Sequence, residues 1–146
     1  MFDMTDFDFE TTTTSYTKWD NSKYIPDVVI INLGANDGSS LAKCVTEEEK
    51  NAFLNNFEQT YRNFVSKIFE TYGNKTKIIS CTNMIGLDSS IKERIIKVIN
   101  DNENMTRWES NCISVGGVMP GRGHPNIEMQ KYAGHELAKL ISNLIK

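Results

Sequence analysis

Long hydrophobic runs are absent from this 146-residue sequence, and no stretch approaches the roughly 18 consecutive apolar residues that a membrane-spanning helix needs. A basic excess is lacking as well. The net charge is −3, and the lysines are interspersed with acidic residues, which argues against a nucleic-acid-binding surface. The opening residues, MFDMTDFDFE, are acidic, whereas an export signal needs basic and then apolar residues. We therefore expect neither membrane insertion nor nucleic-acid binding, and no export signal in this stretch.

Cysteine is scarce. The three cysteines, Cys44, Cys81 and Cys112, show neither a Cys-x-x-Cys pair nor the Cys/His spacing of a metal site. No Gly-x-x-x-x-Gly-Lys-Ser/Thr phosphate-binding loop occurs either, so we predict no metal and no cofactor. We interpret the cysteines as buried thiols that pack as small hydrophobic residues. The sequence leaves open whether Cys81 pairs with Cys112.

The composition is that of one folded domain, with 39% hydrophobic and 24% charged residues. Residues 1–25 contain a four-threonine run and no sustained periodicity, which predicts an irregular N-terminal segment. The domain proper is expected over residues 26–146.

Strand-like and helical patterns alternate along residues 26–146. The run VVIINL is apolar on both faces, which is typical of a central strand in a covered parallel sheet. A long capped helix is predicted between Thr46 and Gly73. Thr46 and the acidic residues 47–49 mark its start, aromatic residues follow at three- and four-residue spacing, and Gly73 marks its end. The expected strands are 28–33, 77–82 and 112–115, and the expected helices are 46–73, 91–99 and 126–144. This order predicts an α/β fold with a parallel sheet between helices.

Two polar residues follow expected strands, at the sheet edge where ligands of such folds bind. Asn36 comes after the first strand and can donate its amide to an oxyanion, although Asn36, Asp37 and Gly38 are also ordinary turn formers. His124 precedes the last helix, in the glycine-rich stretch GRGHPN. It is either a general base or a surface histidine. His135 lies inside that helix, opposite its apolar face, and is expected to be solvated.

The two motifs together carry a family resemblance. INLGAND after the strand PDVVI, with GHPN opening the last helix, resembles the SGNH or GDSL-type esterases, whose blocks include Gly-x-Asn-Asp and a C-terminal histidine. Within this group the sequence is most similar to carbohydrate esterase family 2, which deacetylates xylan and related polysaccharides. The similarity lies in KWDNSKYIPDVVIINLGAND, in CTNMIG and in the HPN ending. The resemblance implies a three-layer, flavodoxin-like SGNH fold and an acetylated carbohydrate as the substrate. It also implies secretion of the full-length protein.

The resemblance implies roles for four residues. Asn36 matches the oxyanion-hole asparagine, and Gly34 permits the close turn before it. Asp37 matches a residue that supports this loop. His124 matches the base that deprotonates a nucleophilic serine.

The family's Gly-Asp-Ser block, with its nucleophile, does not occur in this sequence. We therefore expect the chain to correspond to the C-terminal part of such an esterase, to be incomplete at the N-terminus and to be inactive alone. Ser39, Ser40, Ser89 and Ser90 are interpreted as structural or solvated, which leaves the nucleophile unknown. Gly121 replaces the usual aspartate before the histidine. A backbone carbonyl then has to orient His124, and Arg122 matters only through its main chain.

Two other functions remain open. One is a non-catalytic carbohydrate-binding or interaction module, in which aromatic side chains stack on sugar rings; the candidates are Trp19, Tyr24 and Trp108. The other is a flavodoxin-like domain that binds a small anion at residues 34–40.

Overall fold

The computed structural model describes residues 20–82, 86–110 and 124–146. Its elements follow the predicted alternation. They are the 3-10 helix η1 (Asn21–Lys23), strand β1 (Val28–Ile31), the short helix α1 (Asp37–Leu41), helix α2 (Glu47–Tyr72), strand β2 (Lys77–Cys81), helix α3 (Ser89–Asn100), strand β3 (Met105–Trp108) and helix α4 (Ile127–Leu144). None of the helices within these ranges has the length and apolar character needed to cross a bilayer.

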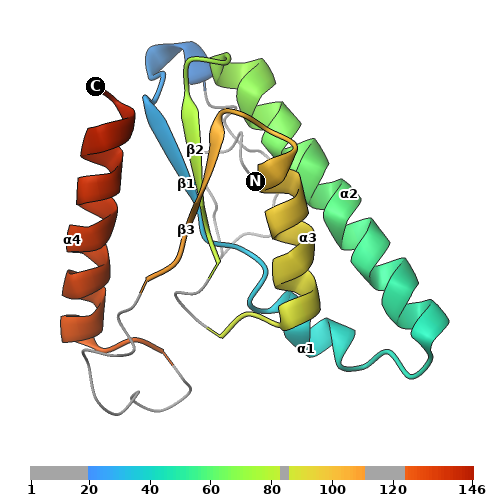
Figure 1. Cartoon of the computed structure of the whole chain (residues 1–146). Coiled ribbons are helices and arrows are strands. Elements are labelled where there is room, and N and C mark those ends of the chain that lie inside the picture. The colour runs from blue at the N-terminus through green and yellow to red at the C-terminus, as the bar shows by residue number, and fades with distance from the viewer. Residues whose placement is uncertain (1–19, 83–85, 111–123) are drawn as a thin grey trace, which may run out of the picture.

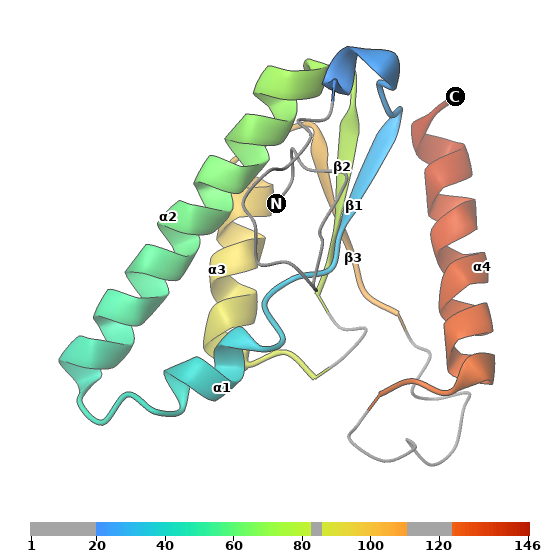
Figure 2. The ribbon, with the colours of Figure 1, turned by 180° about the vertical axis from the view of Figure 1, so that it is seen from behind.

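The described strands form one parallel sheet in the order β1-β2-β3. Val28 is paired with Lys77, and Ile78 with Met105. Helices α2 and α3 cover one face of this sheet and α4 covers the other (Figure 1), and the view from behind shows the same three layers (Figure 2). The predicted three-layer α/β/α architecture with a parallel sheet is confirmed.

Strand β2 contributes side chains to the hydrophobic cores on both faces of the sheet. Ile78 faces the core under α2 and α3, whereas Ile79 and Cys81 face the core under α4. All three are buried, which explains why this strand is apolar at successive positions. The hydroxyl of Ser80, also buried, is hydrogen-bonded to the Tyr61 hydroxyl of α2 at 2.7 Å.

Helix α2 begins with a capping box. The Thr46 side chain accepts from the Glu49 amide at 3.1 Å, and the Glu49 carboxylate accepts from the amides of Thr46 and Val45. The helix ends at Gly73, whose φ is +84°. Both ends lie where the sequence predicts them, since capping groups and a C-terminal glycine are local signals.

Several expectations are corrected. β1 lies at one end of the described sheet and β2 in the middle, so Ile30 of β1 is 45% exposed. The third described strand is β3, in a segment where no strand was predicted, while the strand predicted over 112–115 lies outside the described residues. Cys81 is buried as expected and Cys44 is only half-buried; both are free thiols, and Cys112 lies outside the described residues.

Candidate active site

A cavity of about 490 Å³ opens at the carboxyl end of β1. This is the edge at which open α/β sheets bind ligands. Its volume lies within the range of small-molecule sites, about 300 to 1,000 Å³. The described residues that line it are Asn32, Leu33, Gly34, Ala35, Asn36, Asp37, Phe57, Thr60, Tyr61, Phe64 and His124.

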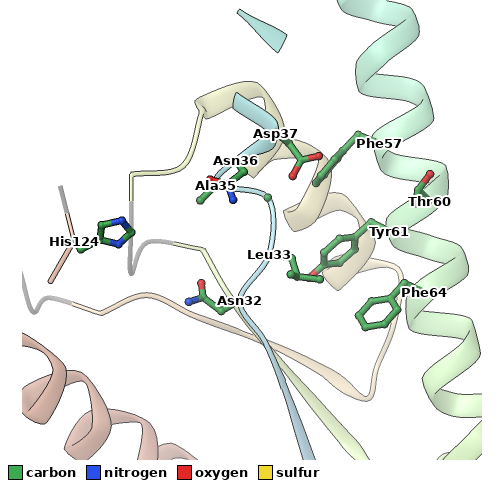
Figure 3. Close-up of a pocket in the computed structure, with 11 residues that line it drawn as sticks. Asn32, Leu33, Ala35, Asn36, Asp37, Phe57, Thr60, Tyr61, Phe64 and His124 are labelled. Atoms are coloured by element: carbon green, nitrogen blue, oxygen red, sulfur yellow. The ribbon is translucent and has the colours of Figure 1, made fainter. Parts of the chain in front are cut away.

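Asn36 and His124, which are far apart in the sequence, both line this cavity. Asn36 comes from the turn after β1, and His124 lies two residues before Asn126, the N-cap of α4. In Figure 3 the segment from Asn32 to Asn36 runs between the His124 ring and the aromatic side chains of α2. Both residues are exposed to solvent, so a ligand can reach them.

Gly34 shapes the backbone before Asn36. It is buried and has a φ of +106°, which side-chain-bearing residues rarely adopt. A Cβ atom at this position would lie 3.1 Å from Leu87 Cδ1 and 3.2 Å from Ile91 Cγ2. Glycine therefore lets the segment after β1 pack against the start of α3, and this contact fixes the position of the following turn.

The turn at Asn36 leads into α1, a helix that the sequence did not predict. Asn36 occupies the N-cap position, but its side chain makes no cap hydrogen bond. The turn is closed by the backbone instead, with the Asp37 amide donating to the Gly34 carbonyl at 3.2 Å. Asn36 thus lies in the turn, as the turn-forming interpretation expects, but its side chain does not cap α1.

Asn126 has the opposite arrangement. Its side chain accepts from the Met129 amide at 2.8 Å, so it caps α4. Pro125 lies directly before this cap. Gly121 and Arg122, which precede His124 in the sequence, lie outside the described residues.

The other predicted residues lie away from the cavity. His135 is exposed on α4, and its Nδ1 is 2.8 Å from the Lys131 carbonyl oxygen. No serine of the described ranges lines the cavity: Ser39 and Ser40 are exposed on α1, and Ser89 and Ser90 open α3. Trp108 is 7% exposed and packs in the core under α4, so it cannot stack on a sugar. Tyr24 is exposed, and Trp19 lies outside the described residues.

The apolar wall of the cavity was not predicted from the sequence. Phe57, Tyr61 and Phe64 of α2 follow the helical period that marks a buried helix face, and this period cannot separate core from cavity lining. Burial raises the pKa of Tyr61 to about 12. Its hydroxyl therefore stays protonated at neutral pH and is no candidate for the base.

A second polar cluster lies at the carboxyl ends of β2 and β3, outside the lining of the cavity. The Glu109 carboxylate is paired with Arg107 and with Lys92 of α3, and accepts from the Thr82 hydroxyl at 3.2 Å. The hydrogen bonds from Arg107 and then Lys92 lower the pKa of Glu109 to about 2. This carboxylate is ionised at neutral pH and joins α3 to the sheet.

This chain is similar in sequence and in fold to known esterases. The family model of the GDSL-like lipases and acylhydrolases matches residues 9–137. The cellulase/esterase CelE of Acetivibrio thermocellus is 33% identical over 91 residues, which is 60% of this chain and 10% of that protein.

Solved structures show the same fold. A family two carbohydrate esterase from Clostridium thermocellum, in complex with cellohexaose, superposes with a TM-score of 0.60 at 24% identity, over 87% of this chain and 39% of that one. A family two carbohydrate esterase from Cellvibrio japonicus gives a TM-score of 0.61 at 18% identity, over 91% and 37%. This chain thus spans less than two fifths of these structures and a tenth of CelE. With the family model matched over most of its length, the chain belongs to the GDSL-like lipase/acylhydrolase family.

Proposed function

We propose that this chain carries the oxyanion-binding and proton-transferring groups of a serine-type carbohydrate esterase. The observation that carries the proposal is that Asn36 and His124 line one cavity at the carboxyl end of a parallel sheet. The likeness to CelE and to the family two carbohydrate esterases supports an acetylated polysaccharide such as xylan as the substrate.

The proposed reaction proceeds through an acyl-enzyme. A serine Oγ attacks the ester carbonyl carbon while His124 takes the hydroxyl proton, and the Asn36 amide donates to the oxygen that becomes negative. Collapse of this intermediate expels the sugar oxygen, which receives the proton from His124. Water then attacks the acyl-serine by the same route and releases the acid.

The serine itself is not assigned. The sequence contains no Gly-Asp-Ser, and the described part of the cavity wall includes no serine. We therefore expect the 146-residue chain alone to hydrolyse no ester. Losing the nucleophile abolishes this mechanism, whereas losing an orienting carboxylate only weakens the base.

The test is release of acetate from p-nitrophenyl acetate and from acetylated xylan. In the protein expressed from the complete open reading frame, whatever its length, we expect His124→Ala to lower kcat/KM by about 10² to 10⁴. Asn36→Ala should lower it by about 10² to 10³. His135→Ala is the matched control, because His135 is exposed on α4 away from the cavity, and its activity should equal the wild type.

Two results contradict the proposal. Equal activities of the His124→Ala and His135→Ala variants exclude His124 as the base. Efficient turnover by the 146-residue chain alone shows that a nucleophile is present in it, which contradicts the account of the missing serine.

A further inference from the structure

A smaller hollow adjoins the cavity, between the start of α1 and one side of α2. Its volume is about 120 Å³, and the described residues that line it are Asp37, Phe53, Asn56, Phe57 and Thr60. We infer that this hollow binds a sugar ring of the polysaccharide, next to the acetylated sugar whose ester lies beside Asn36 and His124. The inference rests on the proposed esterase function and adds to it the direction in which the sugar chain leaves the cavity.

The hollow is continuous with the cavity, because Asp37, Phe57 and Thr60 line both. The four lining residues of α2 are spaced three or four positions apart, so they share one side of the helix. Asp37 is the first residue of α1, and Figure 3 shows its carboxylate beside the Phe57 ring. A ligand larger than one sugar can therefore extend from the cavity into the hollow.

The polar side chains of the hollow are available to a ligand. Asn56 and Thr60 are exposed to solvent, and Asp37 is half-buried. Among the described residues, no hydrogen bond or ion pair involves the side chain of any of these three. They supply a carboxylate that accepts, an amide with a donor and an acceptor, and a hydroxyl that can do both. A ligand can gain hydrogen bonds here without breaking those of the protein.

This combination of groups favours a neutral sugar. Each sugar hydroxyl can donate to Asp37 and accept from Asn56 or Thr60. The half-buried rings of Phe53 and Phe57 offer apolar contact to the C–H groups of a sugar ring.

Other ligands fit less well. An anionic group would be repelled by Asp37, which is the one charged residue of the described lining. A hydrocarbon chain would remove the Asp37 carboxylate and the Asn56 amide from water without giving them hydrogen bonds, which costs free energy. A sugar satisfies both groups, so it is the ligand that we assign to the hollow.

The experiment is an NMR titration of the ¹⁵N-labelled 146-residue chain with xylotetraose, an oligosaccharide whose binding requires no turnover. We expect shifts of the side-chain amide signal of Asn56 and of the backbone amides of Asp37 and Thr60. Asp37→Ala should weaken binding at least about tenfold, because it removes a charged acceptor. Asn56→Ala should weaken binding about two- to tenfold, because the hydrogen bonds that it removes are neutral. Alanine also suits an exposed position of a helix.

Two exposed residues outside the hollow provide matched controls. Glu48 is an acidic residue in the first turn of α2, as Asp37 is in α1, and Asn51 is another exposed amide of α2. Glu48→Ala and Asn51→Ala should bind xylotetraose as the wild type does. The dispersion of each spectrum shows whether the variant is folded, and Asn56→Ala keeps the test decisive if Asp37→Ala does not fold.

The absence of shifts at these signals, up to the solubility limit of xylotetraose, overturns the inference. Equal affinities of the Asn56→Ala and Asn51→Ala variants do the same. The proposed function fails separately. If xylotetraose binds in the hollow but His124→Ala retains esterase activity in the complete protein, the sugar site stands and the catalytic assignment falls. If His124→Ala is inactive and the hollow binds no sugar, only the sugar site falls.

Discussion

Replacing Gly34 by alanine tests whether the backbone before Asn36 depends on glycine. The φ of +106° is unfavourable for alanine and costs about 1 to 3 kcal/mol. The added Cβ would also lie 3.1 to 3.3 Å from three apolar side chains of the core, Leu87, Ile91 and Ile95. These are flexible ends that can shift, so we add about 1 kcal/mol for crowding. Gly34→Ala should therefore lower the free energy of unfolding by about 2 to 4 kcal/mol.

The measurement is urea unfolding of the 146-residue chain followed by circular dichroism, with the slope of the transition checked for constancy. Gly134→Ala is the matched control. Gly134 lies inside α4, and a Cβ there meets nothing within 4 Å, so alanine should stabilise the protein by about 0.5 to 1 kcal/mol. A Gly34→Ala variant as stable as the wild type would show that the turn does not need glycine. Destabilisation of both variants to the same extent would refute the argument from conformation.

Two further substitutions test contacts of α2. The Glu58 carboxylate bonds Lys97 and Arg94 of α3 and Arg62 of its own helix at 2.9 to 3.3 Å, and the hydrogen bonds from Lys97 and then Arg94 lower its pKa to about 2. The folded pKa lies below the ordinary value of 4.5, so this stabilisation is complete above about pH 4.5 and is lost as the pH falls toward 2. Allowing for solvent screening of the partly exposed cations, Glu58→Gln should lower the free energy of unfolding by about 1 to 2 kcal/mol at pH 7. Urea unfolding across pH should show that this difference from the wild type shrinks below pH 4.5. A difference that stays constant between pH 7 and 3 contradicts this. Tyr61→Phe should lower the free energy of unfolding by about 1 to 3 kcal/mol, because it leaves the buried Ser80 hydroxyl without its tyrosine partner. Adding Ser80→Ala should recover part of this loss in urea unfolding. No recovery in the double variant would exclude the hydrogen bond as the cause.

Helix α2 and strand β2 could be predicted from the sequence because their signals are local. The ends of α2 follow from the Thr46 capping box and from Gly73, and its core-facing side follows from the aromatic period. Strand β2 is apolar at successive positions because it is buried on both faces.

Strand β3 was missed because its signal depends on tertiary contacts. Met105 and Trp108 are buried, but Thr106 and Arg107 between them are polar, and four residues are too few to show an alternation. Arg107 is tolerated in the strand because Nε donates to the Thr82 hydroxyl at 3.1 Å and the guanidinium pairs with Glu109. Those partners are supplied by the residues that directly follow β2 and β3, which no local pattern shows.

The candidate site was predictable only in its polar half. Asn36 and His124 stood out because a buried strand and a capped helix place them at the same edge of a parallel sheet. The apolar half did not stand out, since an aromatic period on a helix has the same appearance whether the rings meet the core or an open cavity. Only the packing of α2 against the segment after β1 shows that Phe57 and Phe64 are half-buried and line the cavity.

Two asparagines, Asn36 and Asn126, precede helices at this edge of the sheet, and only one of them caps its helix. The side-chain oxygen of Asn126 accepts a hydrogen bond from the Met129 amide and so fixes the start of α4, two residues after His124. Asn36 has the same position before α1 and makes no such bond; α1 has only five residues and is held by the turn from Gly34 to Asp37. An asparagine cap stabilises a helix by about 1 kcal/mol. That stabilisation is absent at Asn36, which lines the cavity, and the packing of Gly34 against α3 fixes the turn in place of the cap. Because Oδ1 of Asn36 is not held by the backbone of α1, the side chain can turn its Nδ2 group, the donor, toward a ligand oxygen, which is the role that the esterase proposal requires of it.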